Sequence, residues 1–254
     1  MIPIAHHQSR HGEVVVLMSR STVAYWQDER HQSEADHAGV SLAAYIHAIH
    51  HGLRQAESRN VLMIGCGGGT LATMLRSDGV KVTIVEINPR SFAISRRYFH
   101  LPDDVECHVG DGRAFLRASK RKYDAIVLDA YDGSRLPAAM RTPSFFRLAK
   151  SRLHPRHGVL FVNVVMRNDR DRHLDQVAAL MRKAFPKVRL LDAKGTIDRN
   201  AVAMAGAVGN LTLPTMTMRP KAGVRLLRRE IKAMVFHEPK EKAKRVARKV
   251  RKSR

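Results

Sequence analysis

The chain has 254 residues, and its apolar content of 44% is normal for a soluble globular protein. This length buries one sizeable core plus small appendages, so we expect one main domain rather than two equal ones. No stretch approaches the ~20 apolar residues of a membrane helix, and the first residues lack the layout of a secretion signal. Cys66 and Cys107 form neither a disulfide framework nor a metal-spaced pair, so we expect a cytoplasmic protein.

The charge is unusually positive. Lys and Arg number 45 against 23 Asp and Glu, a formal net charge of +22. Such a balance favours contact with polyanions such as RNA, DNA or anionic lipid. Residues 240–254 hold nine of the basic residues and one Glu, and we interpret them as a solvated basic tail. Roughly two thirds of the net charge remains without this tail.

The chain order of apolar and amphipathic segments predicts the fold. Residues 13–27 alternate apolar and polar side chains, which predicts a small β-hairpin or lid, and residues 41–53 have a helical pattern. The segments predicted as strands are 61–64, 82–87, 105–109, 123–128, 159–165, 188–191 and 201–205. The segments predicted as helices between them are 71–76, 89–99, 112–118, 143–153 and 172–185. Residues 224–236 form a last amphipathic, basic segment.

This alternation predicts an α/β fold with a Rossmann-like, doubly wound, seven-stranded sheet. The last two strands are too close in sequence for a crossover helix, so we expect them to form an antiparallel hairpin at one edge of the sheet. The arrangement resembles that of class I methyltransferases. We divide the chain into a small N-terminal β segment with a helix (1–58), a nucleoside-binding domain (59–208) and a basic C-terminal extension (209–254).

A glycine-rich turn follows the first predicted strand, in the sequence VLMIGCGGGTL. Gly65, Gly67 and Gly68 let the backbone turn sharply and approach a ligand, while the next helix presents free N–H groups. Nicotinamide and flavin proteins also use such a turn, and a plain tight turn remains an alternative.

Carboxylates follow the next three strands. Glu86 ends the second strand, where an acid can accept hydrogen bonds from both ribose hydroxyls, and its spacing from the glycine turn fits that role. Asp111 and Gly112 follow the third strand; Asp111 can face an adenine amino group, although Asp-Gly is also ordinary turn chemistry. Asp129 and Asp132 follow the fourth strand, where an acid at the end of a buried strand needs a partner.

In this order, VLMIGCGGGTL, VEIN, GDGRAFL and LDAYDG followed by Pro137 resemble the spermidine synthase (polyamine aminopropyltransferase) family. The resemblance is strongest to its bacterial spermidine-synthase-like branch and runs from about Gln32 to about Ala207. It implies a transferase that moves an aminopropyl group from decarboxylated S-adenosylmethionine to a polyamine, without a metal. Members of the family often pair, so a homodimer is also expected.

The resemblance implies a role for each matching position. Glu86 would bind the ribose, Asp111 and Gly112 the adenine side, and Gln32 the nucleoside from the N-terminal segment. Asp129 would be the catalytic residue that orients the attacking amine and helps to remove its proton, which agrees with the need for a neutral amine nucleophile. Asp132 would bind the far end of a diamine, and Tyr131, which lies between these two acids, would also bind the substrate.

Three departures from the family pattern leave alternatives open. Gly68 stands where the polyamine synthases carry an aspartate that binds the aminopropyl ammonium, so intact S-adenosylmethionine is a second candidate donor. The tyrosine that the family carries before the first strand has no match, because Tyr45 is out of step. DAYD replaces the commoner DSSD. One alternative is a methyltransferase, for which the net charge would favour a nucleic acid as the acceptor. The other alternative is a non-catalytic polyanion-binding module.

Other polar residues are given structural interpretations. His47, His50 and His51 share a helix face but lack an acidic or Cys partner, so we expect packing rather than a metal site. Asn163, near the end of the fifth strand, either faces the ligand or satisfies local backbone groups.

Overall fold

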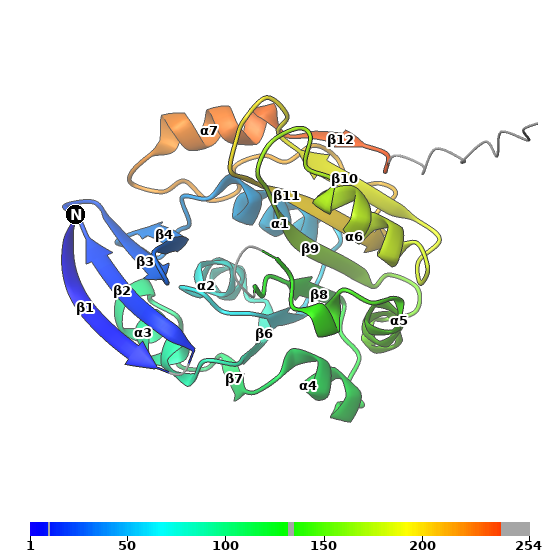
Figure 1. Cartoon of the computed structure of the whole chain (residues 1–254), viewed down its shortest axis with the longest axis horizontal. Coiled ribbons are helices and arrows are strands. Elements are labelled where there is room, and N and C mark those ends of the chain that lie inside the picture. Colours follow the sequence, from blue (N-terminus) through cyan, green and yellow to red (C-terminus); the bar gives the residue numbers. More distant parts are fainter. Residues whose placement is uncertain (10, 132–134, 240–254) are drawn as a thin grey trace, which may run out of the picture.

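The computed structural model describes residues 1–9, 11–131 and 135–239. Two sheets make up the described part of the chain, a small antiparallel sheet and a large mixed sheet (Figure 1). The small sheet comprises β1 (Ile2–Ser9), β2 (Gly12–Met18), β3 (Thr22–Gln27) and β4 (Arg30–Asp36). The large sheet comprises β5 (Asn60–Ile64), β6 (Lys81–Glu86), β7 (Glu106–Val109), β8 (Ala125–Leu128), β9 (Val159–Met166), β10 (Val188–Asp192), β11 (Arg199–Gly206) and β12 (Val235–His237).

The order of strands in the large sheet is β12-β10-β11-β9-β8-β5-β6-β7. The strands from β7 to β9 are parallel, whereas β11 pairs antiparallel with both β9 and β10. The predicted doubly wound sheet is therefore confirmed. The predicted terminal hairpin is also present, but it does not form the sheet edge, because β12 pairs with β10 as an eighth strand.

Helices cover both faces of the large sheet. They are α1 (Ala44–Gln55), α2 (Thr70–Ser77), α3 (Pro89–Phe99), α4 (Gly112–Ala118), α5 (Pro143–Arg152), α6 (His173–Met181) and α7 (Val224–Ala233), with a short 3₁₀ helix, η1 (Ala138–Met140). Buried side chains of α1, α2 and α3 form a core on one face, and those of α4, α5 and α6 form a core on the other. Two covered faces explain why the central strands are almost continuously apolar.

Local sequence signals set the starts of several helices. Pro89 and Pro143 each occupy the first turn, where a missing N–H costs nothing. The Asn88 side chain accepts a hydrogen bond from the Arg90 N–H (3.1 Å), and the Thr142 hydroxyl accepts one from the Phe145 N–H (3.2 Å). These caps are why α3 and α5 begin where the sequence predicts.

The N-terminal segment differs from the prediction. The predicted hairpin over residues 13–27 is present, because β2 and β3 pair antiparallel, but it forms the centre of a four-stranded sheet that runs from Ile2 to Asp36. Apolar side chains of this sheet, including Val16 and Tyr25, pack against Ile94 and Phe99. The outer strands β1 and β4 are rich in His, Gln and Glu, so they lack the apolar alternation that reveals a strand.

No helix in the described ranges is both long and apolar enough to cross a membrane.

Candidate active site

A cavity of about 1010 Å³ opens at the carboxyl ends of β5, β6 and β8, beneath the small sheet. This is the switch point of the doubly wound sheet, where the chain order of strands reverses and ligands of such folds bind. The cavity brings together eight of the residues predicted from the sequence: Gln32, Gly65, Gly67, Glu86, Asp111, Gly112, Asp129 and Tyr131. Gly68 does not line it, and Asp132 lies outside the described residues.

The glycine turn requires glycine for two different reasons. Gly65 has φ +98°, and a Cβ there would lie 2.1 Å from the backbone oxygen of Asp129. Gly67 has φ +50°, and a Cβ there would lie 2.8 Å from the Ser33 hydroxyl. A side chain at either position would collide with a neighbouring loop or strand. The turn is therefore held against both the loop after β8 and the small sheet.

Gly68 is placed differently from the expectation. Its N–H donates to the Ser33 hydroxyl (3.0 Å), so this N–H already has a partner within the protein. A Cβ at residue 68 would lie 2.9 Å from the Phe99 ring. An aspartate at this position, as in the polyamine synthases, would require Phe99 or Ser33 to move.

Glu86 is fixed at the end of β6 by two backbone donors. The Cys66 N–H donates to Oε2 (2.9 Å), and the Asn88 N–H donates to Oε1 (2.8 Å). Burial raises the pKa of Glu86, and these backbone hydrogen bonds oppose the rise. Each carboxylate oxygen keeps a second lone pair, so the carboxylate can still accept hydrogen bonds from a ligand in the cavity.

Asp111 and Gly112 form the beginning of α4. The Asp111 side chain caps the helix, because its Oδ1 accepts a hydrogen bond from the Ala114 N–H (2.7 Å). Gly112 allows α4 to start against β5, since a Cβ there would lie 2.3 Å from Ile64 Cγ2. Asp111 also lines the cavity, and a carboxylate that accepts one hydrogen bond at Oδ1 keeps lone pairs for further donors.

Asp129 follows β8, and its two oxygens have different donors. Asn163 Nδ2 donates to Oδ1 (2.7 Å), and the Tyr45 hydroxyl donates to Oδ2 (3.1 Å). Burial raises the pKa of Asp129, while the Asn163 and Tyr45 hydrogen bonds favour the ionised form and oppose the rise. This combination suits a carboxylate that receives a proton during a reaction.

Sequence reasoning therefore missed one residue of the site and left another undecided. Tyr45 lies in the first turn of α1, and its hydroxyl donates to Asp129, although the sequence spacing had set it aside. Asn163 lies inside β9, and its side chain contacts Asp129 rather than local backbone. A polar residue inside an otherwise apolar central strand was the available signal for Asn163.

Gln32 reaches the cavity from the small sheet through an irregular pairing of β3 and β4. Tyr25 pairs with Ser33 and Trp26 pairs with His31, so Gln32 is the extra residue of a β-bulge. Bulges re-aim side chains, and Gln32 lines the cavity as a result. Tyr131 lines the opposite wall; burial and the nearby Asp129 charge raise its pKa well above the ordinary value.

The cavity is acidic although the chain is strongly basic. Of the described residues that line it, Asp28, Glu86, Asp111 and Asp129 carry carboxylates, and Arg30 is the single Lys or Arg. Like charges gathered in one cavity favour a ligand of the opposite sign. The site is thus suited to a positively charged ligand.

The described residues hold no group of three or more His, Cys, Asp or Glu side chains arranged to bind a metal ion. His47 and His50 are buried in the core beneath α1. His47 Nε2 donates to the Ser41 carbonyl (2.8 Å), and His50 Nδ1 is hydrogen-bonded to the Thr217 hydroxyl (2.6 Å). Both side chains therefore have a structural role in joining α1 to neighbouring segments.

The fold and the site define a Rossmann-like protein with an acidic cavity at the switch point of its sheet. The family model of the spermine/spermidine synthase domain matches residues 43–192, more than half of the chain. The chain belongs to this family, as the sequence motifs indicated.

Relatives with curated names include both aminopropyl and methyl transferases. A probable polyamine aminopropyl transferase of Bifidobacterium longum is 37% identical over 115 residues, 44% of this chain and 26% of the relative. An N-terminal histidine N-methyltransferase of Emericella nidulans is 37% identical over 101 residues, 37% of this chain and 18% of the relative. The matches span about a quarter or less of these relatives.

Among solved structures, a probable spermidine synthase from Corynebacterium glutamicum is similar with a TM-score of 0.73. The alignment covers 92% of this chain and 90% of the other, at 17% identity. At this identity the likeness supports the fold alone. It extends to the N-terminal part of the chain, since it covers nearly all of both molecules.

Proposed function

We propose that this chain is a transferase in which an amine attacks the aminopropyl group of decarboxylated S-adenosylmethionine in the large cavity. The observation that carries the proposal is the position of Asp129, which Tyr45 and Asn163 hold at the wall of an acidic cavity that Glu86 also lines. A polyamine is the acceptor that the family suggests. We further propose a cytoplasmic location, as expected from the sequence.

Four residues that line the cavity are each assigned a role in binding. Glu86 would accept hydrogen bonds from the ribose hydroxyls, and Asp111 would accept one from the adenine amino group. Gln32 and Tyr131 would close the cavity around the donor and the acceptor. Decarboxylated S-adenosylmethionine carries two positive charges, on sulfur and on nitrogen, so the four carboxylates of the cavity favour it over the intact donor.

The chemical step needs little beyond positioning and proton removal. The lone pair of the neutral amine attacks the aminopropyl carbon bonded to sulfur, and a new C–N bond forms. The C–S bond breaks and leaves its electron pair on sulfur, which gives the neutral thioether 5′-methylthioadenosine. The amine nitrogen is now positively charged and gives one proton to the Asp129 carboxylate. The sulfonium is already activated, so correct alignment in the cavity dominates the rate.

Calorimetric titration with the two donors side by side, followed by an assay of Asp129→Asn, tests this proposal. We expect the decarboxylated donor to bind more tightly. The variant should lose about 100-fold or more in transfer rate, because it removes the proton acceptor, while donor affinity changes less than about twofold. Asp103→Asn, which alters a side chain that is 97% exposed, is the matched control and should leave both quantities unchanged.

A preference for intact S-adenosylmethionine would instead support methyl transfer. This second candidate is favoured by Gly68, which removes the acid that would repel the carboxylate of the intact donor, and by the N-methyltransferase relative. If neither donor binds, the alternative of a non-catalytic polyanion-binding module remains. The basic segment that would serve such a module, residues 240–254, lies outside the described residues.

A further inference from the structure

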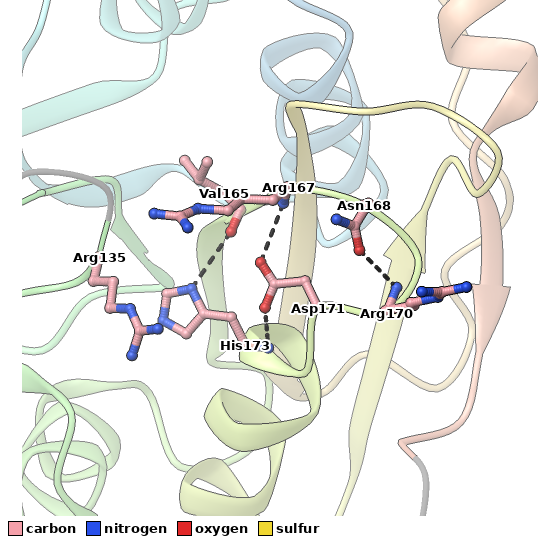
Figure 2. Close-up of a pocket in the computed structure, with 7 residues that line it drawn as sticks. All are labelled: Arg135, Val165, Arg167, Asn168, Arg170, Asp171 and His173. Atoms are coloured by element: carbon pink, nitrogen blue, oxygen red, sulfur yellow. Dashed lines mark hydrogen bonds between the residues drawn. The ribbon is translucent and has the colours of Figure 1, made fainter.

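A second, smaller cavity of about 280 Å³ adjoins the large one (Figure 2). It lies between the loop after β8, which contributes Arg135, and the loop from β9 to α6, which contributes Arg167, Arg170 and Asp171. Val165 lines both cavities. A molecule bound beside Asp129 can therefore extend one end past Val165 toward this group of side chains.

The charged groups of the small cavity are unbalanced. Within residues 1–9, 11–131 and 135–239, the guanidinium groups of Arg135, Arg167 and Arg170 have no ion-pair partner within 4 Å. Among the described residues, Asp171 is the one carboxylate that lines the cavity, and it accepts hydrogen bonds from the backbone. The Arg167 N–H donates to its Oδ2 (3.1 Å), and the His173 N–H donates to its Oδ1 (2.9 Å). Asp171 thus shapes the loop, and positive charge dominates the cavity.

The side chains differ in direction. Figure 2 shows the Arg135 and Arg167 guanidinium groups on the same side as the His173 ring, whereas the Arg170 side chain extends the other way. Two of the three arginines therefore extend toward the side of the cavity that holds the imidazole. Guanidinium groups that line one cavity can present several N–H donors to a planar or tetrahedral anion.

His173 supplies an independent indication of a ligand. The side chain is buried, with 5% of its surface exposed, and Nδ1 donates to the Val165 carbonyl (3.4 Å). Its other nitrogen, Nε2, is buried without a hydrogen-bond partner among the described residues. Burial lowers the pKa of His173, so the ring is neutral, and because Nδ1 carries the proton, Nε2 is an acceptor. A buried acceptor without a partner is costly, and a ligand in the cavity with an O–H group, such as a singly protonated phosphate, would remove that cost.

We propose that the small cavity binds an oxyanion, a carboxylate or a phosphate, carried by the acceptor at the end remote from its attacking amine. This inference rests on the proposed function and narrows the chemical class of the acceptor. The substrate class becomes an amine with an acidic group in place of a simple polyamine. The net charge of +22 supports it, because the field of the chain attracts an acidic acceptor and repels a diamine.

The chain saturated with 5′-methylthioadenosine provides the main test. Calorimetry compares three acceptors that share a primary amine at one end of a short chain and differ at the other end: 4-aminobutanoate, 3-aminopropyl phosphate and 1,4-diaminobutane. We expect at least one acidic compound to bind about 10-fold more tightly than the diamine, and the better of the two identifies carboxylate or phosphate. Tighter binding of the diamine than of both acids would overturn the inference.

Two variants locate the binding. Arg135→Gln and Arg167→Gln should each weaken the acidic acceptor about 10-fold and leave the diamine within about twofold, because each removes a charged donor. Both side chains are exposed, so folding should be preserved, which thermal unfolding checks. Arg172→Gln removes the same charge from an exposed neighbour that does not line the cavity, and it should change neither affinity. If all three substitutions weakened the binding of the acidic acceptor equally, this result would contradict the assignment of its anionic end to the small cavity.

Inorganic phosphate, titrated into the nucleoside-free chain, separates this inference from the proposed function. Phosphate binding that Arg135→Gln and Arg167→Gln weaken, but Arg172→Gln does not, would support the anion site even if neither donor binds. Absence of phosphate binding to the unmodified chain at millimolar concentration would count against the anion site, even if the donor binds as proposed.

Discussion

Among the described residues, the two cavities of this protein share one wall residue, and they differ in the sign of their charge and in the exposure of their charged side chains. Among the described residues of the large cavity, four carboxylates outnumber one arginine, and Asp129 is partly buried and held by neutral donors from α1 and β9. In the small cavity, three arginines outnumber one carboxylate, and all three are exposed. Of the residues that the structure describes, only Val165 lines both cavities. The comparison shows that the net charge of a chain does not predict the charge of its sites, which depends on which side chains the loops bring together.

Glu86→Gln should change the difference between the two cavities most, because it removes the negative charge of the carboxylate that we propose binds the ribose. We expect nucleoside affinity to fall about 10- to 100-fold, as when a charged hydrogen-bond acceptor is lost, and anion binding in the small cavity to stay within about twofold. Calorimetry with each ligand measures both. Glu57→Gln, at an exposed turn, is the control. Equal weakening of both ligands would show that the two cavities are not independent.

Tyr45→Phe should have a smaller effect, confined to the large cavity. The hydroxyl stabilises the ionised form of Asp129, whose pKa burial already raises. Its loss raises that pKa further, so a smaller fraction is ionised at a given pH. We expect the transfer rate to fall about 3- to 10-fold and the acid limb of the pH–rate profile to move to higher pH. An unchanged acid limb would separate Asp129 from proton removal; Tyr98→Phe, on α3, should leave the profile unchanged.

Salt should have the smallest effect and should act on the small cavity. Raising the ionic strength from about 0.05 M to about 0.5 M screens exposed charges, so affinity for the acidic acceptor should fall a few-fold. The transfer rate from the saturated complex should change less, since Asp129 is buried against Tyr45 and Asn163. Steady-state kinetics at several salt concentrations separate these quantities. A rate that falls as steeply as the affinity would mean that Asp129 is as exposed to salt as the arginines.

The regular part of the fold was predictable because each element carries its own signal. Apolar runs predicted β5 to β11, and Pro89 and Pro143 marked the starts of α3 and α5. The small sheet was not predicted in full, since its outer strands are polar and depend on packing against α3. The division into three parts stays a prediction.

The candidate site was predictable where its residues follow strands. Glu86, Asp111 and Asp129 come at strand ends, and the topology of a parallel sheet brings such ends together. Tyr45 and the group of Arg135, Arg167 and His173 were not foreseen, because helix packing and loop geometry join residues far apart in sequence. The roles assigned to the residues of the large cavity remain predictions until a donor is bound.

The tight approach of Gly65 to the backbone oxygen of Asp129 has a consequence for engineering this enzyme family. The glycine turn that would bind the donor and the segment that carries Asp129 touch without room for a methyl group. A shift of one segment therefore moves the other. A larger residue in place of Gly65, introduced to change the choice of donor, would also displace Asp129. Selectivity is better redesigned at Gln32, which lines the cavity from the small sheet, because a change of this side chain leaves Gly65 and its contact with Asp129 in place.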